Sequence, residues 1–192
     1  MLAATERLLQ QGNSFGSISI EQLTKEAGMA RGTFYLHFKD KGELVARLMD
    51  FFTEEVTSSF GTWTENAEIA EPKDVAAAVR GMVKSFKSHE AIIVAVRDTM
   101  PNDNNVADLY EKMMNTISEM AMESMKAIKQ RGLSRENADY DRVGFALGWI
   151  VGLYCTYFID RHNTKELNHA INALDYVCQT AIFSDAAREQ LD

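Results

Sequence analysis

Apolar residues recur at every third or fourth position along almost the whole chain, and this spacing predicts helices. An amphipathic helix turns one face to the core once every 3.6 residues, whereas a half-buried strand alternates apolar and polar side chains. No segment shows a clear alternation, and the chain contains only two prolines, Pro72 and Pro101. We therefore predict an all-α fold.

Four apolar stripes predict the longer helices that follow the first forty residues. They cover residues 41–63, 72–86, 106–130 and 167–182. The third is expected to end beside Gly132, because glycine readily adopts the positive φ found just beyond many helix ends. These stripes predict a helical bundle.

A fifth helix is predicted where 17 consecutive uncharged residues occur, from 143 to 159. This length lies at the lower limit for a membrane-spanning helix, but three glycines and the charged flanks favour a buried helix and no membrane. Small residues every four positions let another helix approach closely, either within the subunit or from a partner, and both alternatives stay open. For a homodimer, the candidate interface residues are Gly144, Gly148, Gly152, Ile171, Leu174 and Cys178.

Charge divides the chain into two parts. Residues 1–48 carry a net charge of +1, and the other 144 residues carry −9, for a total of −8. The apolar fraction of 46% is that of a globular protein. Because the acidic part would repel phosphates, any contact with nucleic acid is expected within residues 1–48.

Two short helices joined by a tight turn are predicted inside this N-terminal part. Residues 19–22 have the S-x-x-Q form of a capping box, which marks a helix start, and Gly28 can supply the positive φ at the helix end. A second helix over 31–38 follows, so the segment predicts a helix-turn-helix. In that motif the second helix enters the major groove of DNA.

The segment 27–44, AGMARGTFYLHFKDKGEL, resembles the DNA-binding signature of the TetR family of bacterial transcriptional regulators. The resemblance implies a three-helix DNA-binding domain over 1–48 and an antiparallel helical bundle for ligand binding and dimerisation over 49–192, with about nine helices in all. Segments 88–91, 106–110 and 131–132 are further similar to the EthR-type subgroup of actinobacteria.

The resemblance assigns DNA contacts to particular residues. Tyr35 and Lys41 match positions that contact phosphates, and Arg31 is the best candidate for bonding a guanine, since its fork can reach O6 and N7 together. For His37, contact with a base and packing against its own domain remain alternatives. Ala30 replaces the Ser or Thr that often precedes the recognition helix, so a cap is missing. The DNA-binding candidates are Ser19, Arg31, Gly32, Thr33, Tyr35, His37 and Lys41.

Methionine is abundant in the predicted bundle, with five residues in the helix over 106–130. Methionine fills irregular space and can repack around varied ligands, although ordinary core packing gives the same pattern. By the EthR-type resemblance, a pocket for a small hydrophobic effector would lie between the middle helices. Its candidate lining residues are Met82, Phe86, Tyr110, Met114, Ile117, Met120 and Trp149.

Catalytic, metal and cofactor chemistry find no support in the sequence. The two cysteines are isolated and the four histidines are scattered, which argues against a metal site, and the reduced cysteines with an unremarkable N-terminus predict a cytoplasmic protein. We therefore expect a homodimeric repressor that binds a palindromic double-stranded operator and is released by an apolar effector. The alternatives are an activator without ligand-induced release and a helical small-molecule-binding module that has lost DNA binding.

Overall fold

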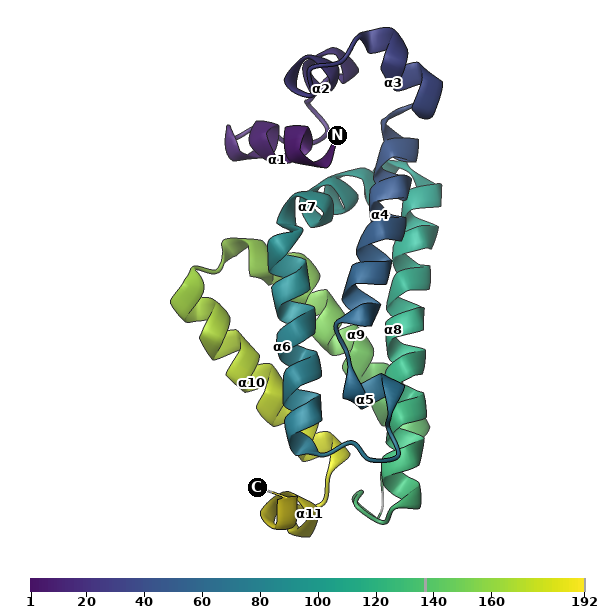
Figure 1. Cartoon of the computed structure of the whole chain (residues 1–192), viewed down its shortest axis with the longest axis vertical. Coiled ribbons are helices and arrows are strands. Elements are labelled where there is room, and N and C mark those ends of the chain that lie inside the picture. The colour runs from purple at the N-terminus through teal and green to yellow at the C-terminus, as the bar shows by residue number, and fades with distance from the viewer. Residues whose placement is uncertain (137, 192) are drawn as a thin grey trace. The chain divides into compact units, whose positions relative to one another are not determined.

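The computed structural model describes residues 1–136 and 138–191, and this part of the chain contains eleven α-helices, two 3-10 turns and no strand (Figure 1). The all-α prediction is confirmed. Helices α7 (Glu90–Thr99) and α11 (Asp185–Leu191) lie outside the stretches for which the sequence predicted helices, and α5 (Thr62–Glu65) is a separate short helix.

The chain folds into two compact units. Unit 1 comprises Met1–Glu54 and His89–Lys112, and unit 2 comprises Glu55–Ser88 and Met113–Asp192. The units are defined by packing, and unit 1 includes a segment from the middle of the chain. A functional division at residue 48 stays a prediction.

Unit 1 contains the predicted helix-turn-helix. Its elements are α1 (Leu2–Gln10), α2 (Ile20–Glu26), α3 (Arg31–His37), α7 (Glu90–Thr99), η1 (Met100–Asn102) and the first parts of α4 (Lys41–Ser58) and α8 (Asn104–Gln130). A small core joins the first four helices and the loop between α1 and α2, and it consists of Leu8, Ile18, Leu23, Phe34 and Leu44. Through Phe34, this shared core holds α3 in place within unit 1.

Local signals set the bounds of α2 and α3 as the sequence predicted. The Ser19 hydroxyl accepts the N–H of Gln22 at 3.1 Å, and the Gln22 side chain accepts the N–H of Ser19 at 2.7 Å. Gly28 follows α2 with a φ of +67°, which is the conformation expected of a glycine at that turn. Ala30 precedes α3 and its methyl group provides no cap.

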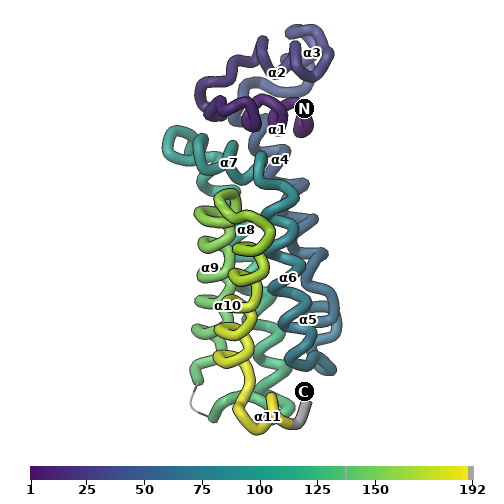
Figure 2. Tube along the Cα trace, turned by 90° about the vertical axis from the view of Figure 1, so that its left-hand side faces the viewer, coloured from purple at the N-terminus to yellow at the C-terminus, as the bar shows by residue number. Residues whose placement is uncertain are grey.

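Unit 2 is a helical bundle. Its elements are α5, α6 (Pro72–Ser88), α9 (Tyr140–Phe158), η2 (Ile159–Arg161), α10 (Thr164–Ile182), α11 and the remaining parts of α4 and α8. Helices α6, α9 and α10 lie side by side (Figures 1 and 2). Helix α8 ends at Gln130, and Gly132 beyond it has a φ of +70°, as predicted.

The expected helix over 41–63 is broken into two. Helix α4 ends at Ser58, and Gly61 adopts a φ of +51° before α5 begins. Phe60 and Trp63 are nevertheless buried. The apolar spacing therefore continued across a turn, and the prediction of one uninterrupted helix was wrong.

The glycine face of α9 packs against α8 of the same subunit. A methyl group at Gly144 would lie 2.7 Å from the Met122 Cα, and one at Gly148 would lie 2.6 Å from the Ser118 Cα. At Gly152 the nearest atoms belong instead to the flexible end of the Met114 side chain. Residues 140–161 are long and apolar enough to span a bilayer, and 44% of an apolar 18-residue segment within them is buried inside the protein. The glycines thus serve helix packing inside unit 2.

Candidate nucleic-acid interface and ligand cavity

Helix α3 has one buried side and one side that faces solvent. Phe34 is fully buried in the core of unit 1, whereas Tyr35 is 48% and Leu36 82% exposed. Successive helical residues are about 100° apart, so Leu36 lies on the side opposite Phe34. Phe34 therefore anchors the inner side of this short helix in the core, and the outer side is exposed to solvent.

Arg31 and Tyr35 form a pair on the surface of α3. The Arg31 Nη2 donates to the Tyr35 hydroxyl at 3.4 Å, and the guanidinium carbon lies 5.8 Å from the centre of the tyrosine ring. This hydrogen bond is the main cause that raises the pKa of Arg31 above its usual value. Both side chains are exposed, so they can exchange this weak mutual contact for a nucleic acid.

Lys41 has a different environment from the one that the family resemblance implied. Its ammonium group donates to the carbonyl oxygens of Phe15 and Ile18 at 2.6 Å each and of Gly16 at 3.2 Å. The Nζ atom also lies 4.6 Å from the centre of the Phe15 ring. Partial burial lowers the pKa of Lys41, although Asp98 opposes this effect. Lys41 therefore fastens the loop between α1 and α2 to the start of α4.

The same loop is held from α7 as well. The Asp98 carboxylate accepts the N–H of Phe15 at 3.0 Å. Lys41 and Asp98 thus bind complementary polar groups of the same loop. Lys41 donates to its carbonyl oxygens, and Asp98 accepts a hydrogen bond from one of its amide N–H groups. The loop contributes two buried side chains, Phe15 and Ile18, so the fold of unit 1 depends on its position.

The other DNA-binding candidates are spread over the ends and sides of α2 and α3. The Ser19 hydroxyl is engaged in the capping box, and Thr33 is half-buried. Gly32 is exposed, and so is His37, whose ring centre lies 6.3 Å from that of Phe38. Both alternatives for His37 remain open, because it touches its own domain and also faces solvent.

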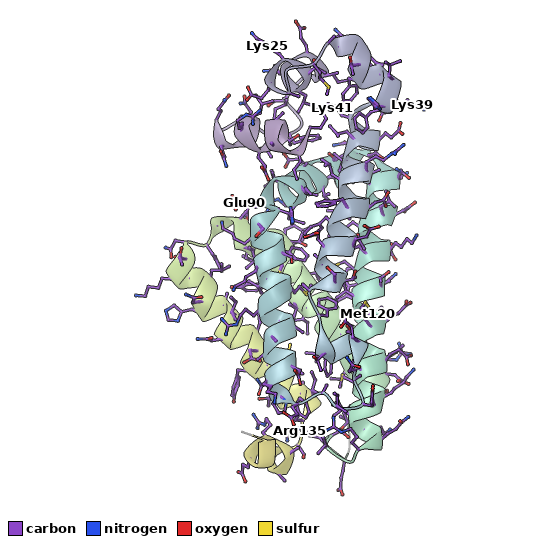
Figure 3. The ribbon with its side chains drawn as sticks, viewed as in Figure 1. Lys25, Lys39, Lys41, Glu90, Met120 and Arg135 are labelled. Carbon is purple, nitrogen blue, oxygen red and sulfur yellow. The ribbon has the colours of Figure 1, made fainter. Side chains whose placement is uncertain are left out.

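Two further cations lie at the end of α2 and just after α3. Lys25 and Lys39 are exposed, and Figure 3 shows both at the outer edge of unit 1, whereas Lys41 is half-buried. Glu21 lies close enough to Arg31 to raise its pKa slightly. The exposed cations of α2, α3 and the following turn provide the charge that attracts phosphates.

Unit 2 contains a small apolar cavity with a volume of about 60 Å³. Helices α5, α6, α8, α9 and α10 contribute to it, and no charged side chain lines it among the described residues. Burial raises the pKa of the Cys178 thiol to about 12, so this lining group is neutral. The lining residues are Phe60, Trp63, Val75, Ala78, Val79, Met82, Ile117, Ala121, Met125, Leu147, Gly148, Val151, Cys178 and Ile182.

The cavity includes only some of the side chains that the sequence suggested for a ligand. Met82 and Ile117 line it. Phe86 and Met114 are fully buried elsewhere in unit 2, and Met120 and Trp149 are half-buried outside the lining. Tyr110 belongs to unit 1. Trp63 lines the cavity too, as the sequence suggested for one end of the pocket. A helical period identifies the buried side of a helix but not which buried residues border a cavity, so Val79 and Met125 were missed.

The candidate interface residues of the sequence analysis lie inside unit 2. Ile171, Leu174 and Cys178 are buried together with the three glycines of α9. The exposed apolar side chains of these two helices lie on other faces. They are Phe145, Ile150, Leu153, Tyr157 and Phe158 on α9 and Tyr176 and Val177 on α10.

Comparisons with known proteins agree with this geometry. Residues 1–48 match the sequence family described as bacterial regulatory proteins, tetR family. The transcriptional regulator EthR of Mycobacterium tuberculosis is 26% identical over 188 residues, which cover 96% of this chain and 86% of the relative. EthR of Mycolicibacterium smegmatis is 28% identical over 136 residues, and the match spans 69% of this chain but only 60% of that relative.

A solved structure shows the same fold over nearly the whole chain. The transcriptional regulator FadR from Bacillus subtilis, determined in complex with stearoyl-CoA, superposes with a TM-score of 0.70. The match covers 94% of this chain and 95% of that chain, at 16% sequence identity.

Proposed function

Because this chain belongs to the TetR family of bacterial transcriptional regulators and has EthR-like relatives, we propose that it is a cytoplasmic, homodimeric repressor of a palindromic operator. Regulators of this family are DNA-binding proteins and not enzymes, and they typically act as dimers that respond to small molecules. The proposed effector is a small, uncharged, apolar molecule.

The outer side of α3 is the observation that carries the DNA-binding part of the proposal. Its core-facing residue, Phe34, fixes the helix, and Arg31 and Tyr35 project from the surface with a chemistry suited to bases and phosphates. In helix-turn-helix dimers two such helices enter successive major grooves about 34 Å apart. Repression would follow where the bound operator overlaps a promoter.

The dimer is proposed to form through the apolar side chains that α9 and α10 leave exposed. Tyr176 is 67% exposed and Ile150 is 50% exposed, although both belong to helices whose other faces are buried. Exposed groups of large apolar side chains favour a partner, and a second copy presents the same chemistry in return. This assigns the subunit contact to faces of α9 and α10 other than the glycine face.

Release is proposed to begin in the cavity of unit 2. A volume of about 60 Å³ holds only a few waters, whereas drug-sized ligands occupy pockets of about 300–1,000 Å³. A ligand must therefore displace flexible lining side chains such as Met82 and Met125. Helices α4 and α8 contribute to both units, so a ligand that prefers one conformation of the dimer would change the half-site spacing.

Operator binding by the full chain tests this function. The chain would be titrated on DNA from upstream of its own gene, and on scrambled DNA, at two salt concentrations. We expect a two-fold-symmetric footprint whose affinity falls as salt rises, because phosphate contacts release counterions. Absence of any preference for the upstream DNA, or for a site selected from random sequences, would instead favour a helical binding module.

Ligand-induced release is tested on the same complex with 1-decanol as a neutral apolar probe and decanoate as its charged counterpart. We expect decanol to weaken operator binding more than decanoate, because a carboxylate would enter a cavity without a charged partner. Enlarging Val79 with Val79→Trp would fill the cavity and should abolish the response. Equal operator affinity with and without 1-decanol would support the alternative of a regulator without ligand-induced release.

A further inference from the structure

Gly32 lies in the first turn of α3 although nothing in the subunit requires a glycine there. Its φ is not positive, and a methyl group built on it would meet no atom of the described residues within 4 Å. Glycine lowers helix stability relative to alanine, so its presence calls for a reason. Close approach of another molecule to the backbone is the reason that glycine can supply.

Leu36 lies one helical turn beyond Gly32 on the same outer side of α3. It is 82% exposed, the largest exposed fraction among the large apolar side chains of the described residues. Residues four apart are neighbours on a helix surface, so the bare backbone at Gly32 and the leucine side chain form one ridge. We call these two residues the outer ridge of α3.

The polar residues of α3 lie beside the outer ridge. Arg31 and Tyr35 follow one flank as an i, i+4 pair, and His37 and Thr33 lie toward the other flank. Lys39 adds an exposed cation just beyond the helix. An apolar side chain that protrudes between groups suited to nucleic acid is placed to meet the floor of a groove, while its neighbours meet the walls.

We propose that Leu36 is a specificity-determining residue that contacts the 5-methyl group of a thymine in each operator half-site, with Gly32 allowing α3 to approach that base. The inference rests on the proposed DNA-binding function. In the major groove, base edges offer hydrogen-bond donors and acceptors, and the thymine methyl is the apolar group among them. A leucine side chain has no polar atom, so it distinguishes thymine from the other bases through this methyl group alone.

The size of the effect follows from the small contact. Burial of one methyl-sized group contributes about 0.8 kcal/mol, which corresponds to a change in affinity of about four-fold per half-site. Replacing the thymine by uracil removes only the methyl group and leaves the pairing edge and the phosphates intact. Uracil substitution is therefore the direct probe of a leucine–methyl contact.

The experiment uses the full chain and an operator selected from random DNA. Each thymine of a half-site is replaced in turn by deoxyuridine, symmetrically in both halves, and affinity is measured for the wild-type chain and for Leu36→Ala. We expect one thymine whose replacement weakens wild-type binding about four-fold per half-site and leaves Leu36→Ala binding unchanged. Ile69→Ala is the matched control, because Ile69 is a 63% exposed aliphatic residue in unit 2. The control should keep the wild-type sensitivity.

The outcomes separate the inference from the proposed function. Specific binding in which no thymine shows this dependence on Leu36, or in which Leu36→Ala keeps the full sensitivity to uracil, would overturn the inference and leave the DNA-binding regulator in place. A wild-type chain that selects no sequence at all would overturn the proposed function and the inference with it. Circular dichroism of Leu36→Ala should match the wild type, since the side chain lies outside the core.

Discussion

At the scale of the residue, replacing Gly32 is expected to change the stability of α3 and its binding to DNA in opposite directions. Gly32→Ala should raise the free energy of unfolding by up to about 1 kcal/mol, because the added methyl group meets open space and alanine favours the helix. The same substitution should weaken operator binding, because the methyl group would stand between the backbone and the DNA. Urea denaturation and a gel-shift titration measure the two effects on the same protein. Unchanged operator affinity would show that the DNA stays away from this turn.

Lys41 leads to the opposite expectation for a residue of the same motif. Lys41→Ala should lower the free energy of unfolding by about 1–3 kcal/mol, since the ammonium group bonds three carbonyls of the loop between α1 and α2. Its loss should not alter the slope of log affinity against log salt, because an ammonium that serves the loop contacts no phosphate.

Tyr35→Ala provides the comparison, as Tyr35 is exposed and matches a phosphate-contacting position of the family. Its loss should weaken binding to all sequences with little effect on stability.

For Lys41→Ala, a contradicting result would be a slope of log affinity against log salt that falls by about one. It would mean that the ammonium group leaves its carbonyls for a phosphate when DNA binds.

At the scale of the element, the four-residue spacing of glycines in α9 fits the close packing of that helix against α8. Gly148→Ala should destabilise unit 2 by about 1–3 kcal/mol, because the new methyl group would meet the Ser118 backbone at 2.6 Å. Thermal unfolding measures this loss. Gly32→Ala is the internal control, since it makes the same chemical change in a helix with open space. An unchanged melting temperature for Gly148→Ala would mean that α8 and α9 separate without cost.

Element bounds could be predicted wherever the signal was local. The Ser19–Gln22 capping box, the turn at Gly28 and the end of α8 beside Gly132 each depend on a few neighbouring residues, and all three are present. The break at Gly61 could not be predicted, because the apolar period runs on to Trp63 and conceals the turn.

Contacts between distant parts of the sequence were beyond prediction in the candidate site. Lys41 turns inward because carbonyls more than twenty positions earlier converge on it, and no pattern around residue 41 shows this. The cavity is similar, since its lining combines five helices, and periodicity shows which side of each helix is buried without showing where packing leaves a gap. The outer side of α3, by contrast, depends on one helix and its core anchor Phe34, so its position followed from the motif.

At the scale of the whole molecule, charge divides the chain at about residue 48. The acidic excess of the chain lies outside residues 1–48, so electrostatic attraction to DNA is confined to that N-terminal segment. Helices α4 and α8 contribute residues to both units. Under the proposed function, a monomer would bind a half-site weakly, because a single α3 makes few contacts, and the pairing of two copies would make specific binding strong.

Tyr176→Asp should therefore convert the proposed dimer to a monomer and reduce operator affinity to that of a single half-site. Tyr176 is 67% exposed on α10, so the substitution should leave the fold intact, whereas a carboxylate facing its own copy across a two-fold interface would be repelled and desolvated. Loss of a central interface tyrosine weakens association by about 2 kcal/mol or more. Sedimentation equilibrium measures the mass, and Ile69→Asp is the matched control, because it places the same charge at another exposed apolar position of unit 2. A dimer that persists in Tyr176→Asp but dissociates in Ile69→Asp would show that the subunit contact does not lie on α10. The half-site spacing of the operator would then have to follow from a different pairing of the two copies.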